Sequence, residues 1–274
     1  MSKLLKITCL ISTVALAQEG RLAFSAYDAD AGRHLPYTYD LETDDLREVP
    51  LPVEADCGDL ALIYDGSRVA VELTVDGEEM LYVRPTRTGE VAAHRAPFPG
   101  AEPSWIEYTT LCYTIDGDLW HWNGVTDPLD WLDNVGLWPV QGDWLTVYYV
   151  SLAVAEWTVV ERNVNTGEQE VLLVRMDPIR EPDVSPDGTR LAVAVGNDVI
   201  LVDLTGGERP RNLALPTDAR PCYPSFSPDG EWVAYYDAGV GAVMAAPVEG
   251  GDPVKLRDLE DCRGLDWGPT PEDW

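Results

Sequence analysis

Lysine and histidine are scarce in this chain. Its 274 residues contain three lysines and three histidines, and its 19 Lys+Arg stand against 48 Asp+Glu, for a formal charge of −29. A nucleic-acid-binding surface needs cations to replace the counterions along the phosphates, so this composition excludes that class of protein. It also disfavours binding to an anionic membrane surface.

Catalytic signatures are missing as well. The sequence has no G-x-S-x-G, H-E-x-x-H, C-x-x-C, P-loop or G-x-G-x-x-G motif. His121 stands between two tryptophans on an expected strand, which is typical of a packed histidine. Acidic residues occur throughout, so no carboxylate pair stands out. We therefore predict a protein without a catalytic centre, a cofactor or a metal site.

One apolar run occurs, and it is short. Lys3 and Lys6 precede Ile7–Ala17, which ends in Ala-Leu-Ala. This is the pattern of a secretory signal peptide, and it is too short to span a bilayer. We predict a signal peptide over residues 1–17 and a mature protein, 18–274, in the periplasm or outside the cell. A buried N-terminal strand or a lipid anchor on Cys9 are the alternatives.

The remaining sequence is rich enough in apolar residues to fold, since 45% of the chain is hydrophobic and it holds 10 Trp and 12 Tyr. It also repeats. The segments Pro182–Val193 and Pro224–Tyr235 share a Ser-Pro-Asp-Gly followed by alternating apolar residues, 42 positions apart. Pro-Asp-Gly is a turn signal, and alternation indicates strands. Each unit is expected to contain four strands.

The repeat extends in both directions. The apolar positions that we align are separated by 43, 33, 46, 42 and 41 residues; they are Leu62, Trp105, Trp138, Val184, Phe226 and Trp267. A period of about 40–45 residues with four strands in each unit is typical of a β-propeller. We read the tryptophans at these positions as core between blades.

The two ends of the chain complete each other. Arg21–Tyr27, Leu35–Leu41 and Leu46–Leu51 suggest three strands of a blade that lacks its first, and Cys262–Pro269 suggests a first strand alone. The prediction is an all-β, six-bladed propeller closed by the C-terminal strand. Its expected blades are 18–55 with 259–274, 56–101, 102–133, 134–178, 179–216 and 217–258.

The two Ser-Pro-Asp-Gly units resemble the TolB-like, WD40-like (PD40) repeat. Each continues into an alternating strand and a Gly-Gly turn, at Gly206-Gly207 and Gly250-Gly251. Two units match well, one matches in part and three match by spacing, so the strong resemblance covers about a third of the chain. It implies a six-bladed propeller in the bacterial envelope.

The expected function is binding. In the repeat frame, the loops that enter each first strand lie at the channel mouth, where mixed charges and a tyrosine suit a polar protein interface. We predict that a monomer binds a protein or peptide partner there, through Asp56, Asp177, Arg180, Glu181, Asp218, Arg220, Tyr223, Glu260 and Arg263. The alternatives are a glycoside hydrolase or lyase, and a carbohydrate-binding module that uses the Trp105–Trp157 cluster.

The acidity and the cysteines leave choices open. The negative charge is spread along the chain, which favours adaptation to salt over attraction of a cationic partner.

Four cysteines follow the signal peptide, and an even number in an exported chain permits disulfides. Cys57 and Cys262 share one repeat position, and Cys222 lies one residue later in its own repeat. Cys57–Cys262 and Cys222–Cys262 are the candidate disulfides, free buried thiols are the alternative, and Cys112 is expected to be a buried thiol.

Overall fold

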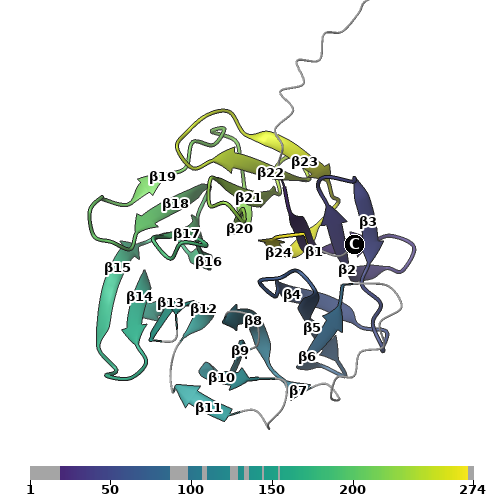
Figure 1. Cartoon of the computed structure of the whole chain (residues 1–274), viewed down its shortest axis with the longest axis horizontal. Helices are drawn as coiled ribbons and strands as arrows, with labels where there is room; N and C mark the ends of the chain where they lie inside the picture. The colour runs from purple at the N-terminus through teal and green to yellow at the C-terminus, as the bar shows by residue number, and fades with distance from the viewer. Residues whose placement is uncertain are drawn as a thin grey trace, which may run out of the picture.

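The chain forms six four-stranded antiparallel sheets arranged as blades in a ring (Figure 1). The computed structural model describes residues 19–86, 98–106, 110–123, 129–132, 136–143, 145–153 and 155–270. No helix long and apolar enough to cross a bilayer occurs in this part of the chain. The expected signal peptide and His94 lie outside the described residues. The predicted six-bladed β-propeller is confirmed.

In each blade the strands run in order from the centre of the ring outward. Blade one contains β24 (Cys262–Gly268), β1 (Arg21–Asp28), β2 (Arg33–Asp40) and β3 (Asp45–Glu48). Blade two contains β4 (Asp56–Leu62), β5 (Arg68–Val75), β6 (Glu78–Pro85) and β7 (Phe98–Pro99). Blade three contains β8 (Ala101–Ile106), β9 (Thr110–Ile115), β10 (Asp118–Trp122) and β11 (Leu129–Leu132).

The second half of the ring follows the same plan. Blade four contains β12 (Leu137–Asp143), β13 (Thr146–Ala153), β14 (Glu156–Asn163) and β15 (Gln169–Arg175). Blade five contains β16 (Ile179–Val184), β17 (Arg190–Val195), β18 (Asp198–Asp203) and β19 (Arg211–Asn212). Blade six contains β20 (Pro221–Phe226), β21 (Trp232–Asp237), β22 (Ala242–Pro247) and β23 (Val254–Asp258).

The ring closes inside blade one, as the sequence predicts. The C-terminal strand β24 pairs antiparallel with β1, and Trp267 lies opposite Leu22. Both side chains are buried in a cluster that also contains Phe24 of blade one and Tyr236 of blade six. Strand alternation places one face of each sheet against its neighbour, so the hydrophobic core consists of layers between blades.

The repeated turns form as expected. The amide of Gly188 donates to the Ser185 carbonyl, and that of Gly230 donates to the Ser227 carbonyl, both at 2.8 Å. Both glycines have positive φ, 69° and 70°, which a side chain at that position would strain. The Pro-Asp-Gly signal therefore marks the turn between the first and second strands of blades five and six.

Trp138 corrects the predicted repeat frame. It lies in the bulge of β12, three residues before the residue of that strand that occupies the aligned position. Counted from the bulge, Gln141 is the residue that matches Trp105 of blade three. Gln141 is buried because its amide accepts from the Cys112 thiol at 3.2 Å and donates to the Asp143 carbonyl at 2.7 Å. A search for apolar residues cannot find a polar residue that is satisfied in this way.

Neither candidate disulfide is formed in the structure. Cys57, Cys112, Cys222 and Cys262 are free thiols. The Cys262 thiol donates to the Gly264 carbonyl of its own strand at 3.2 Å. Burial raises the pKa of the Cys57 thiol to about 12 and also raises those of Cys112 and Cys262. The pairing of Cys262 therefore stays a prediction about the oxidised protein.

Thiol labelling of the native protein tests this arrangement. We expect Cys222 to react with iodoacetamide far faster than the three buried cysteines, because it is partly exposed and the thiolate is the reactive form. In denaturant without reductant, all four should react, as intact mass would show. Two cysteines that react only after reduction would instead establish a disulfide.

Candidate binding site at the central channel

The innermost strand of every blade contains a bulge. The pairing register shifts in β24, β4, β8, β12, β16 and β20, so two residues of the inner strand oppose one residue of the second strand. In four of the blades a proline follows the first bulged residue. Proline has no N–H to donate, so it suits a place where the ladder is already broken.

The first bulged residue has a left-handed backbone in these four blades. Its φ is 51° at Glu102, 47° at Trp138, 54° at Glu181 and 54° at Tyr223. Such φ values are uncommon outside glycine, so the surrounding structure must hold them. The bulge also turns the backbone amide toward the neighbouring blade, where it needs an acceptor.

Half-buried carboxylates of the preceding blade supply these acceptors. Glu181 of blade five accepts the Tyr223 amide of blade six at 2.6 Å. Glu72 of blade two accepts the Glu102 amide of blade three at 3.0 Å, and Glu102 in turn accepts the Trp138 amide of blade four. Each bond joins one blade to the next around the ring.

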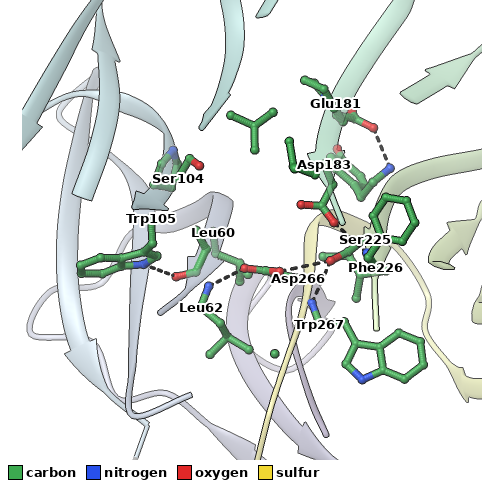
Figure 2. A pocket seen from close by; sticks show the side chains of 18 of the residues that line it. Leu60, Leu62, Ser104, Trp105, Glu181, Asp183, Ser225, Phe226, Asp266 and Trp267 are labelled. Carbon is green, nitrogen blue, oxygen red and sulfur yellow. Dashed lines mark hydrogen bonds between the residues drawn. The ribbon is translucent and has the colours of Figure 1, made fainter. Parts of the chain in front are cut away.

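A second set of bonds repeats at the far end of the inner strands (Figure 2). Asp183 accepts the Phe226 amide at 2.7 Å, and Ser225 accepts the Trp267 amide at 3.0 Å. Asp266 accepts the Leu62 amide at 2.7 Å. Three successive junctions, from blade five through six and one to two, thus use the same position. We call the bonds of both sets the interblade bonds.

The next junction uses a different donor. Blade two has Ala61 where the preceding blades have an acceptor side chain, and the Trp105 indole of blade three donates to the Ala61 carbonyl at 2.9 Å (Figure 2). The Arg68 guanidinium lies over the Trp105 ring, 5.7 Å from its centroid. The indole is therefore committed to the junction and does not form a free platform.

The same acids surround a central channel. A cavity of about 330 Å³ follows the inner strands, and none of its described lining residues is Lys, Arg or His. Burial, reinforced by the charge of Asp266, raises the pKa of Asp183 to about 8. Burial raises that of Glu102 to about 7 and that of Asp266 above its usual range. The channel is thus acidic in composition, and loss of water disfavours the ionised form of these acids.

Close contact with the lining residue Asp59 restricts one residue beside the channel to glycine. A Cβ on Gly264 would lie 2.7 Å from Asp59 Oδ1, and its φ is 137°. Burial, together with the charge of Glu72, raises the pKa of Asp59 well above its usual range. Asp59 accepts the adjacent Leu60 amide at 2.8 Å. Blades one and two therefore meet more closely here than a larger side chain would permit.

The predicted partner-binding residues lie at the end of the ring where the inner strands begin, across blades five, six, one and two. We call them the binding arc: Asp56, Asp177, Arg180, Glu181, Asp218, Arg220, Tyr223, Glu260 and Arg263. Five are exposed and four are half-buried. The fold brings Arg263 into an ion pair with Asp56 and Glu181 onto the Tyr223 amide.

Sequence reasoning missed the carboxylates inside the channel. Asp59, Glu102, Asp183 and Asp266 are not distinguished from the other acids by any motif. A signal existed at two of them, because Asp183 and Asp266 each stand one residue before an aligned apolar position. Only the structure shows that this position meets the backbone of the next blade.

The described tryptophans do not form an exposed platform. Trp122 and Trp267 are buried, and Trp105, Trp120, Trp138 and Trp157 are half-buried. Trp122 packs against Phe98, with ring centroids 5.2 Å apart. The side chains of Trp131 and Trp144 lie outside the described residues. Core packing is therefore the role of the cluster members whose side chains are described.

Similar structures share the propeller. TolB from Acinetobacter baumannii has a TM-score of 0.76 and 18% identity over 92% of this chain and 67% of that chain. A chain of the nidogen/laminin complex has a TM-score of 0.67 and 12% identity, covering 91% and 98%. A prolyl endopeptidase has a TM-score of 0.54 and 16% identity, covering 89% and 42%.

No family model matches the chain, and no curated protein matches it. At the identities above, the structural likeness establishes the fold alone. The neighbours include a chain seen in a protein complex and a peptidase, so the fold is compatible with both binding and catalysis. The TolB-like repeat family remains a resemblance, whereas the six-bladed architecture that it implied is confirmed.

Loss of one interblade bond should weaken the fold. We expect Asp266→Ala to lower the free energy of unfolding by about 2–4 kcal/mol, because the Leu62 amide loses its acceptor in a buried site. Asp266→Asn retains an oxygen acceptor and should cost less. Urea denaturation measures both, with the exposed Asp252→Ala as the control. A change below about 0.5 kcal/mol for Asp266→Ala would contradict the role assigned to this bond.

The pKa of Asp183 predicts a pH dependence. Its pKa is about 8 in the folded protein, against an ordinary value of 3.8, so the folded state binds more protons than the unfolded state between these values. Its contribution to stability is therefore present at low pH and declines as pH rises toward 8. Relative to Asp183→Asn, the wild-type melting temperature should fall between pH 5 and 8. Parallel curves for the two proteins would refute this expectation.

Proposed function

We propose that this protein is a non-catalytic propeller that binds a protein or peptide partner on the binding arc, in the periplasm or outside the cell. The observation that carries the proposal is the set of exposed charges of both signs, with the half-buried Tyr223, at the end of the ring where the inner strands begin. Mixed charge around an aromatic residue is typical of polar protein interfaces. The signal-peptide pattern of residues 1–17 supports the location.

The hydrogen bonds that the channel acids accept favour a binding function over a catalytic one. Asp183, Glu102 and Asp266 accept backbone amides of the next blade. A general acid must be free to exchange its proton with a substrate. These carboxyl groups are instead held by the fold, which leaves the exposed arc as the surface available to a partner.

A glycan-cleaving enzyme is the second candidate, and one observation favours it. The carboxyl groups of Asp183 and Glu102 have pKa values of about 8 and 7 inside a cavity, and glycosidases use a carboxylic acid with a raised pKa. Activity on polysaccharides that Asp183→Asn abolished without unfolding the protein would favour this function over the proposed one.

Charge reversal tests the binding arc. Arg180, Arg220 and Arg263 changed together to Glu should abolish or strongly weaken capture of a partner from envelope extract by the mature protein. The reason is that these are the arc's three cations, and the substitutions would leave a uniformly anionic surface. Quantitative mass spectrometry of the captured proteins provides the measurement.

A matched control uses three arginines at the opposite end of the ring. Arg190, Arg209 and Arg211 lie beside the turns of blade five and line a separate groove. Their reversal to Glu changes the net charge equally and should leave capture intact. Equal capture by wild type and the arc variant would remove this surface as the binding site.

A further inference from the structure

His34 lies between two carboxylates at the point where the ring closes. It is on β2, with 3% of its surface exposed. Its Nδ1 lies 3.2 Å from Asp56 Oδ1, at the start of β4, and its Nε2 lies 3.1 Å from Asp261 Oδ2, directly before β24. Its backbone amide also donates to Asp56 Oδ1, at 2.9 Å. Three segments distant in sequence meet at this imidazole.

Both ring nitrogens must donate in this geometry. A neutral imidazole has one N–H and one lone pair, whereas an imidazolium has two N–H groups. A lone pair on either nitrogen would face a carboxylate oxygen within 3.2 Å, which is repulsive. Two hydrogen bonds to two ionised carboxylates therefore require the doubly protonated ring.

The surrounding charges agree with this requirement. Burial by itself raises the pKa of Asp56, but the His34 amide and the Arg263 guanidinium outweigh that effect. The pKa of Asp56 is therefore lowered. The Asp261 side chain is 56% exposed, so water solvates its carboxylate. The Tyr27 ring on β1 lies edge-on to the imidazole, with centroids 5.5 Å apart. Arg33, which directly precedes His34 in the sequence, is paired with Glu54.

We propose that His34 is a buried imidazolium that acts as a positioning residue for the binding arc. It ties Asp56 to Asp261, and the second oxygen of Asp56 holds Arg263, so two arc residues from two blades take fixed positions. It also anchors the loop before the closing strand, where the Tyr27 amide donates to the Asp261 carbonyl at 3.2 Å. The consequence for partner binding rests on the proposed function, whereas the charge of the ring does not.

NMR of the ¹⁵N-labelled wild-type protein tests the proposal directly. At pH 7 the imidazole of His34 should show protons on both nitrogens. Assignment comes from His34→Gln, which removes the signals. A His34 ring with one unprotonated nitrogen at pH 7 would overturn the proposal, and this state is read from the wild-type protein.

A matched pair of variants separates the charge from simple packing. Asp261→Asn keeps an oxygen near Nε2 but removes its charge, so the ring should no longer hold protons on both nitrogens at pH 7. Asp258→Asn, on the same segment but paired with Lys255, should leave both protons in place. Two ring protons in all three proteins would show that Asp261 does not hold the charge.

Amide exchange reports the positioning role. In His34→Gln, the Tyr27 amide should exchange about tenfold faster, since a charge-assisted bond that anchors its acceptor loop is lost. Amides of β17 in blade five serve as the internal control and should not change. Unchanged exchange at Tyr27 would refute the anchoring role. Failure of the arc variant to alter capture would refute only the proposed function.

Discussion

The ring depends on backbone amides that the bulged inner strands direct across the blade junctions. A bulge removes an amide from the ladder of its own sheet, and an amide buried without an acceptor costs about 1–3 kcal/mol. Side chains of the preceding blade accept these amides at distances from 2.6 to 3.0 Å. Apolar packing between blades is non-directional, whereas these bonds set the rotation of one blade relative to the next.

This constraint offers a structural explanation for the raised pKa values of the acids in the channel. A cavity with carboxyl groups of raised pKa is the usual signature of an active site. Here the same burial that raises the pKa of Asp183 follows from its position against the Phe226 amide of the next blade. Structural acids and catalytic acids share the cause of the shift, which is loss of water, so a raised pKa by itself does not separate the two roles.

The junction between blades one and two concentrates further interactions. Asp266 bonds to Leu62 at one end, and His34, Asp56, Asp261 and Arg263 meet at the other. The first and last described strands, β1 and β24, pair in blade one, so its inner strand is held there by that pairing and not by chain connectivity. A ring closed in this way gains most from contacts that fix the closing strand. The hydrogen bonds of His34 also connect this junction to two residues of the binding arc, Asp56 and Arg263.

The sequence alone determined the period, the six blades and the closure, because strand alternation and Pro-Asp-Gly turns are local chemistry. It also indicated the end of the ring where the first strands begin. It did not determine that Trp138 lies in a bulge and that Gln141 occupies its place, since buried polar groups are satisfied by partners distant in sequence. Nor could it separate Asp183, Asp266 and Asp261 from the other acids. Those roles exist only once the ring brings each carboxylate against an amide or an imidazole of another segment.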